Sequence, residues 1–135
     1  MYLLDTDIIS NLLKRHPSTV LIAKLASIPP SQQFTSSITL GELVYGAFRL
    51  KESAQSLLER IDKLLLANLT VLPFDSSAAR GYGEIRARLE SHGILTGDAD
   101  LRIASIALSH NLTVVTGNVR HFERIPGLRI ENWLA

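Results

Sequence analysis

The 135-residue chain has no cysteine, no long apolar run and no large excess of charge of either sign. Without cysteine it has no disulfide bond and no thiolate-bound zinc, which is consistent with a reducing cytosol. No apolar stretch approaches the ~18 residues that a membrane-spanning helix needs, and no basic stretch before an apolar core marks a signal peptide. We therefore expect a cytoplasmic protein without a membrane partner.

The charge balance is close to neutral, since 14 basic and 13 acidic side chains give a net charge of +1. Non-specific nucleic-acid binders often carry a large positive excess, so RNA binding here requires a local basic face beside an acidic site. The hydrophobic content of 46% is ordinary for a globular protein, and the length suffices to bury one core. We predict a single domain over residues 1–135.

Short apolar segments alternate with amphipathic segments along the chain, which predicts an α/β fold. The expected strands are residues 2–4, 34–36, 70–72, 112–115 and 128–130. Helices are expected between them, including residues 6–13, 39–50, 53–67, 75–91 and 98–110. We predict a three-layer α/β/α sandwich with a mostly parallel central sheet. Ligands of such sheets bind at the carboxyl edge of the strands, where the following helices begin.

Acidic and amide side chains fall at this edge in the predicted topology. They are Asp5 after the first strand, Glu42 in the helix after the second, Asp98 and Asp100 at the start of the last long helix, and Asn118 after the strand that follows it. Crowded carboxylates raise one another's pKa, and a hard divalent cation relieves this conflict. Oxygen ligands suit Mg²⁺, with Mn²⁺ as an alternative, and such an ion can activate water for phosphodiester hydrolysis.

Each of these acids also has a structural interpretation. Acids in the first turn of a helix are stabilised by the helix dipole, by roughly 0.3–1 kcal/mol each. The segment from Thr39 to Glu42 matches a capping box, and Asp98 alone equally suits a helix cap. Asp5 is harder to explain in this way, because a lone carboxylate directly after a buried strand is costly without a partner.

Four motifs, in one order, resemble those of the PIN-domain family. They are LLDTDIIS at residues 3–10, SITLGELVYGA at 37–47, GDADLRIA at 97–104, and LTVVTGN at 112–118 followed by His121-Phe122. The ending at residues 126–133 resembles the tail of VapC-type toxins. The resemblance spans nearly the whole chain.

This resemblance implies an endoribonuclease that uses magnesium or manganese, is usually dimeric and is held inactive by a cognate antitoxin. Carried over position by position, it assigns catalytic roles to Asp5, Glu42, Asp100 and Asn118, with Asp5 and Asp100 as metal ligands and Asp98 as an additional candidate ligand. Thr6 and Thr116 match hydroxyl positions near the metal, where they would help to position substrate. Arg102 stands where relatives often carry an apolar residue; it either contacts RNA phosphate or faces solvent.

Residues 53–67 form the clearest amphipathic helix, with Leu57, Leu58, Ile61, Leu64 and Leu65 at helical spacing. This is more leucine than a single thin core needs. We therefore predict a homodimer that also offers an apolar groove to an antitoxin helix. The alternative, that the whole stripe is core, stays open.

Two other functions are weighed against the ribonuclease. Asp5-Thr6-Asp7 has the form of the first motif of haloacid-dehalogenase-type phosphatases, in which Asp5 would be the nucleophile, although Ile8 stands where glycine is expected. A PIN-like module that binds RNA or a protein without cutting is the second alternative. Metal dependence discriminates, because a binding module works in chelator and a metal nuclease does not.

Several other polar residues have no clear motif. The four histidines show no metal-ligand spacing, although His121 lies close in sequence to the proposed site. Five arginines, namely Arg80, Arg86, Arg88, Arg120 and Arg124, either line an RNA path or form solvated helix faces.

Overall fold

The computed structural model describes residues 1–134. Its strands form one sheet in the order β3-β2-β1-β4-β5, and every neighbouring pair is parallel. The strands are β1 (Tyr2–Leu4), β2 (Gln33–Ser36), β3 (Thr70–Leu72), β4 (Thr113–Val115) and β5 (Ile130–Glu131). The predicted α/β fold with a parallel central sheet is confirmed.

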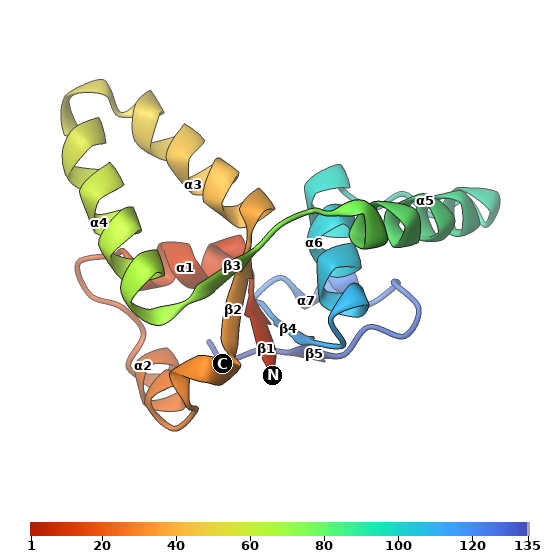
Figure 1. Cartoon of the computed structure of the whole chain (residues 1–135), viewed down its shortest axis with the longest axis horizontal. Coiled ribbons are helices and arrows are strands. Elements are labelled where there is room, and N and C mark those ends of the chain that lie inside the picture. The colour runs from red at the N-terminus through yellow and green to blue at the C-terminus, as the bar shows by residue number, and fades with distance from the viewer. Residues whose placement is uncertain (135) are drawn as a thin grey trace.

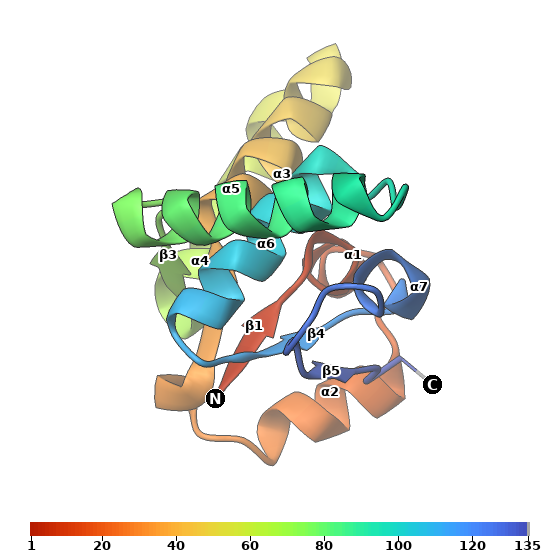
Figure 2. The ribbon, with the colours of Figure 1, turned by 90° about the vertical axis from the view of Figure 1, so that its right-hand side faces the viewer.

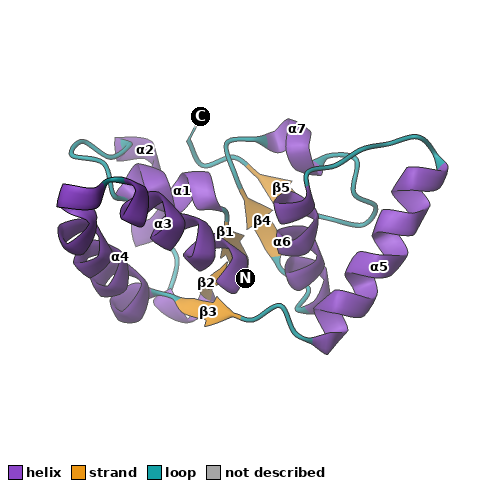
Figure 3. Cartoon of the chain, turned by 90° about the horizontal axis from the view of Figure 1, so that it is seen from above, coloured by secondary structure: helices purple, strands orange, loops and turns teal. Residues whose placement is uncertain are grey.

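Helices cover both faces of the sheet, which gives the predicted three layers (Figures 1 and 3). On one side lie α1 (Thr6–Leu12), α2 (Thr19–Ala26), α3 (Ser37–Arg49) and α4 (Ala54–Asn68). On the other side lie α5 (Ser76–Ser91), α6 (Asp98–Ser109) and α7 (Val119–Phe122). Short 3₁₀ turns occupy Pro30–Gln32 and Lys51–Ser53. None of the helices in residues 1–134 is both long and apolar enough to cross a membrane.

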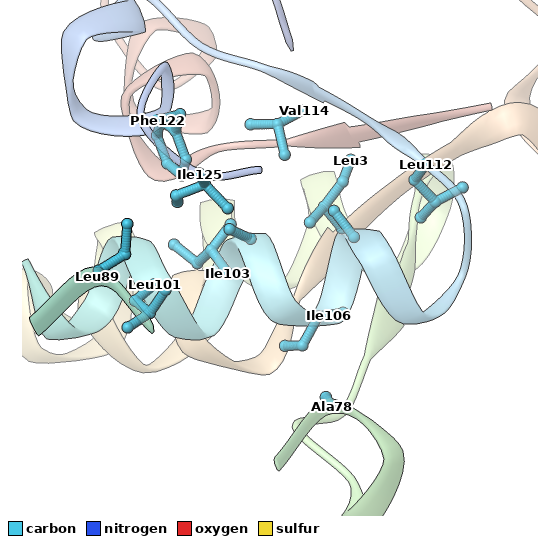
Figure 4. Close-up of a cluster of buried hydrophobic side chains, with 12 residues drawn as sticks. Leu3, Ala78, Leu89, Leu101, Ile103, Ile106, Leu112, Val114, Phe122 and Ile125 are labelled. Carbon is cyan, nitrogen blue, oxygen red and sulfur yellow. The ribbon is translucent and has the colours of Figure 1, made fainter. Parts of the chain in front are cut away.

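Two hydrophobic cores lie on opposite faces of the sheet. Successive strand side chains point to opposite faces, so Leu3 and Val114 enter one core while Leu4 and Val115 enter the other. The first core joins the sheet to α6 and α7 and includes Phe122 (Figure 4). Because both faces are buried, the inner strands β1 and β4 are mainly apolar and were recognisable in the sequence, whereas β2 also carries the polar residues Gln33, Thr35 and Ser36.

The start of α1 is set by the residue before the predicted helix 6–13. Asp5 is the N-cap residue, and its Oδ1 accepts a hydrogen bond from the Thr6 amide at 2.7 Å. Asp75, by contrast, caps α5 as predicted and accepts from the Ala78 amide at 3.0 Å. The first candidate acid therefore also terminates β1 and begins α1.

The start of α3 corrects the interpretation of Glu42. The helix begins at Ser37, not Thr39, because the Ser36 hydroxyl accepts a hydrogen bond from the Thr39 amide at 3.0 Å. Glu42 thus lies beyond the first turn, and its carboxylate bonds to another helix. The capping-box interpretation of Glu42 is wrong.

The C-terminal segment also differs from the prediction in detail. Residues 119–122, for which the sequence analysis gives no element, form the short helix α7. The last strand is Ile130–Glu131 instead of residues 128–130, and it pairs with Val114 and Val115. Figure 2 shows how the chain leaves β4, passes close to α1 and enters α7 at the carboxyl edge of the sheet.

Candidate active site

The carboxyl edge of the sheet brings together side chains that are more than a hundred residues apart in sequence. The Thr116 hydroxyl, after β4, donates a hydrogen bond of 2.8 Å to Asp5 Oδ2, after β1. The backbone continues this pairing, since the Asp5 amide donates to the Val115 carbonyl at 2.9 Å. On the other side of β1, the Thr6 hydroxyl donates to Glu42 Oε1 at 2.8 Å.

Asp5 is the most perturbed group of this site. Its side chain is buried, with 4% of the residue exposed. Burial raises the pKa of Asp5 from 3.8 to about 6; the hydrogen bonds from Thr116 and Thr6 lower it, and the charges of Asp7 and Asp100 raise it further. Without a cation, the ionised form of Asp5 is therefore unfavourable in the folded protein, and a nearby positive charge would stabilise it.

Glu42 is held by a chain of hydroxyl groups. The Thr6 hydroxyl has one proton, and it donates that proton to Glu42. The Thr39 hydroxyl, 3.0 Å away, therefore donates to Thr6. Ser36 donates in turn to the Thr39 hydroxyl at 3.3 Å. The chain of donors orients the Glu42 carboxylate while leaving its second oxygen without a protein partner among the described residues.

Asp100 is half-buried and lies beside His121 of α7, with 3.1 Å between Asp100 Oδ2 and His121 Nδ1. Burial raises the pKa of Asp100, the nearby His121 lowers it, and the charges of Glu42 and Asp7 raise it. The effect of these charges indicates that Asp100 shares one electrostatic environment with the other candidate acids. In the sequence, the only signal of this contact is the position of His121, three residues after Asn118.

Asp7 lies at the site as well, although it is not among the predicted site residues. Its Oδ2 accepts a hydrogen bond from the Gly117 amide at 2.8 Å and lies 3.4 Å from Asn118 Nδ2. The Asn118 amide donates to the Thr116 hydroxyl at 2.9 Å. Asp7 therefore fixes the turn that carries Asn118. The Asp-x-Asp pattern was the available signal, but it was considered only for the phosphatase alternative.

Asp98 and Arg102 lie in a separate cluster. Arg102 Nε lies 2.8 Å from Asp98 Oδ2, and the Tyr82 hydroxyl donates to Asp98 Oδ1. These contacts, the Tyr82 hydrogen bond first, lower the pKa of Asp98. The Arg102 guanidinium also stacks over the rings of Phe74 and Tyr82, at 5.5 and 5.3 Å from their centroids.

This arrangement does not support either expectation for Asp98. Its carboxylate neutralises Arg102 on an exposed surface, so it is not directed at the acids around Asp5. It also makes no capping hydrogen bond, since Gly97 occupies the N-cap position of α6. Arg102 is correspondingly occupied by Asp98 and the aromatic rings, which leaves it poorly placed to contact phosphate.

The donor set at the sheet edge suits a hard cation. Within residues 1–134, no three His, Cys, Asp or Glu side chains form a closed ligand cluster. Magnesium does not require one, because it usually keeps several waters and takes one or two carboxylates from the protein. Asp5 and Asp100 offer two such carboxylates, and neighbouring acids contribute to raising the pKa of each. The residues present therefore fit a partly hydrated Mg²⁺ or Mn²⁺.

The side chains of Asp7 and Leu134 approach Gly117 closely. A Cβ at this position would stand 2.8 Å from both Asp7 Oδ2 and Leu134 Cδ1. We expect Gly117→Ala to lower the free energy of unfolding by about 1–3 kcal/mol, measured by denaturant titration. Gly81→Ala is the control, because a Cβ in that helix meets nothing within 4 Å and is expected to add ~0.5–1 kcal/mol. Equal stability of the two variants would contradict the contact with Asp7.

A comparison with protein families decides the wider relationship. The PIN-domain family matches residues 2–128. The chain belongs to the PIN-domain family. This match spans the whole sheet edge from Asp5 to Asn118, and it does not support the phosphatase alternative for Asp5.

Individual PIN-domain relatives match over their full length. The chain is 38% identical to ribonuclease VapC2 of Rickettsia felis, covering 98% of each chain. It is 39% identical to the tRNA(fMet)-specific endonuclease VapC of Salmonella typhimurium, covering 98% of this chain and 97% of the relative. The crystal structure of DNA-bound VapBC from Salmonella typhimurium superposes with a TM-score of 0.89 at 39% identity, covering 98% and 97%.

Proposed function

We propose that this chain is a divalent-metal-dependent endoribonuclease that acts as the toxin of a toxin–antitoxin pair. The observation that carries the proposal is the buried Asp5 carboxylate, whose pKa of about 6 reflects burial together with the charges of Asp7 and Asp100. A protein that only binds RNA has no use for such repulsion facing phosphates. The names of the VapC relatives support RNA as the substrate, which would place the protein in the cytoplasm.

In this proposal Asp5 and Asp100 hold the metal, which is magnesium or manganese. When bound there, such an ion would supply Lewis-acid chemistry, lowering the pKa of water and offsetting charge on the phosphodiester. Thr116 keeps one Asp5 oxygen in place through its 2.8 Å hydrogen bond, while His121 does the same for Asp100. Both carboxylates are therefore oriented before the ion binds.

The remaining residues act on water and substrate. Glu42, oriented by the Thr6 hydroxyl, holds the attacking water with its free oxygen. Asn118 is neutral and is positioned by Asp7 and Thr116, so it orients a phosphate oxygen or a ligand water without adding repulsion. Since water is the nucleophile, the ribose 2′-hydroxyl is not needed. The products carry a 5′-phosphate and a 3′-hydroxyl.

The antitoxin would bind along α4. A cavity of about 430 Å³ has an apolar lining from Leu13, Leu43, Leu57 and Ile61, and its polar lining includes Thr6, Glu42, Lys14 and Arg60. A helix laid in this groove would reach the active site and block it. In the predicted leucine stripe, Ile61 and Leu65 are buried, and Leu57, Leu58 and Leu64 are partly buried against the same core. Leu57 and Ile61 also line the groove. Tyr45 and Phe48, both exposed on α3, offer an apolar surface for the proposed homodimer.

The test is cleavage of total RNA by the purified protein in Mg²⁺, in Mn²⁺ and in chelator. We expect cleavage with either ion, none in chelator, and recovery when the ion is restored. Product ends that accept ligation at a 5′-phosphate support water attack. Cyclic-phosphate ends, or full activity in chelator, would overturn the proposed chemistry.

Glu42→Gln tests the water-orienting role separately. The amide keeps the shape and the Thr6 hydrogen bond but cannot accept a proton, so we expect cleavage to slow by ~10²-fold or more. Thermal unfolding should change little, because Glu42 caps no helix. Glu52→Gln, at an exposed position on the turn before α4, is the matched control. Wild-type activity of Glu42→Gln would remove Glu42 from the mechanism.

A further inference from the structure

A groove of about 360 Å³ lies between the start of α6 and the α7 segment. It is lined by Leu95, Thr96, Gly97, Asp100, Arg120, His121, Glu123 and Arg124. Asp100, the candidate metal ligand, belongs to this lining, so the groove is continuous with the candidate active site. Figure 2 shows α7 and the start of α6 on the same side of the sheet as the loop that follows β4.

The α7 segment, residues 119–125, is buried on the side that faces the core and basic on the side that faces solvent. Phe122 and Ile125 are buried in the core shared with α6, which fixes the segment against the sheet (Figure 4). The positions between and beside these anchors face outward, and Arg120 and Arg124 are both exposed there. Their basic side chains are therefore presented by a rigid segment at the edge of the groove.

Within residues 1–134, Arg120 and Arg124 are unpaired, as is Arg80 of α5, whereas three other arginines of α5 and α6 are paired. Arg86, Arg88 and Arg102 each form an ion pair with a nearby acid. Within residues 1–134, Arg120 and Arg124 make no ion pair and no side-chain hydrogen bond, so their guanidinium groups are available. Glu123 is the only acid in the groove besides Asp100.

We propose that this groove is a phosphate subsite, in which Arg120 and Arg124 bind the RNA backbone beside the bond that is cut. The inference rests on the proposed function, because it takes the scissile phosphate to lie at Asp5 and Asp100. A strand held there continues into the groove, where the planar guanidinium fork matches phosphate oxygens. A protein helix suits the groove along α4 better, since that groove is mainly apolar.

Binding of a fluorescently labelled short single-stranded RNA tests the subsite. The measurements use full-length protein carrying Asp5→Asn, so that RNA is not cut, with Arg120→Ala or Arg124→Ala added. We expect each arginine variant to raise Kd roughly 5- to 10-fold and to reduce the salt slope of log K by ~0.7. Glu123→Gln is expected to lower Kd. Arg80→Ala, at an exposed position on α5 outside the groove, is expected to leave Kd unchanged.

A second probe separates phosphate recognition from base contacts. An RNA of the same sequence with uncharged methylphosphonate linkages is expected to bind wild-type and arginine variants equally. Arginine variants that bind natural RNA with the wild-type Kd and salt slope would overturn the subsite. If the arginine variants bind natural RNA normally but no longer bind the antitoxin, the groove is a site for a protein partner.

Cleavage by the protein with Asp5 intact keeps this inference separate from the proposed function. If the wild type cuts RNA in Mg²⁺ and the arginine variants cut with unchanged KM, only the subsite fails. If the wild type neither binds nor cuts RNA, the proposed function fails and the subsite with it. A raised KM with little change in kcat is the expected result, because the arginines lie beside the reacting bond and not on it.

Discussion

Asp5→Asn is expected to reduce RNA cleavage by ~10²-fold or more, because it removes a negatively charged metal ligand worth several kcal/mol in the transition state. The amide keeps the shape of the side chain. Its oxygen can still accept from the Thr6 amide, and its NH₂ can donate to Thr116, so the local hydrogen bonds survive with one reversed. The loss should appear in cleavage of total RNA at saturating Mg²⁺.

The same variant should not destabilise the metal-free protein at neutral pH. The pKa of Asp5 is raised from 3.8 to about 6, so the folded state binds this proton more tightly than the unfolded state. Protonation of Asp5 therefore stabilises the folded state. This stabilisation is complete below pH 3.8 and is lost as the pH rises through about 6. Ionised Asp5 then costs about 3 kcal/mol, which asparagine avoids.

Denaturant titration in chelator at several pH values measures this difference. We expect Asp5→Asn to be more stable than the wild type above pH 6, and the difference to disappear below the unfolded-state pKa of 3.8. Adding Mg²⁺ should stabilise the wild type more than the variant, since only the wild type offers the carboxylate. A variant that is inactive because it is unfolded, or one that cuts RNA normally, would contradict this account of Asp5.

Asp100→Asn and Asp98→Asn form a matched pair on the same helix turn. We expect Asp100→Asn to lose cleavage by ~10²-fold or more, because it removes the second carboxylate ligand. Asp98→Asn should retain activity within about twofold, because its carboxylate pairs with Arg102 and Tyr82 instead of facing Asp5. The lost ion pair is exposed and worth only ~0.2–1 kcal/mol of stability.

Mg²⁺ titration of cleavage distinguishes the roles of these two acids. Asp100→Asn should require a higher Mg²⁺ concentration for half-maximal activity, and Asp98→Asn should follow the wild-type curve. Equal losses in both variants would mean that Asp98 also holds the ion, contrary to its position in the structure. Gln substitution of Glu90, an exposed acid paired with Arg86, provides a control for surface charge.

The sequence by itself determined the layers and most elements of this protein. The segments at residues 2–4 and 113–115 are mainly apolar because they are buried in the middle of the sheet, and the long helices alternate apolar and polar residues with helical periodicity. These are local properties of the chain. For the same reason Asp5 was recognisable as a candidate, since a carboxylate directly after a buried strand needs a partner wherever the rest of the chain lies.

Only the tertiary structure decided which polar groups meet. Glu42 matched a capping box locally, but Ser36 is the N-cap of α3, and Glu42 accepts a hydrogen bond from Thr6 of α1. Asp7 and His121 gained their roles from Gly117 and Asp100, contacts between separate segments. Asp98 and Asp100 look alike in sequence, yet residues two positions apart on a helix point in directions that differ by about 200°. The direction of a side chain relative to distant elements is set by how the helices pack on the sheet, which no local pattern encodes.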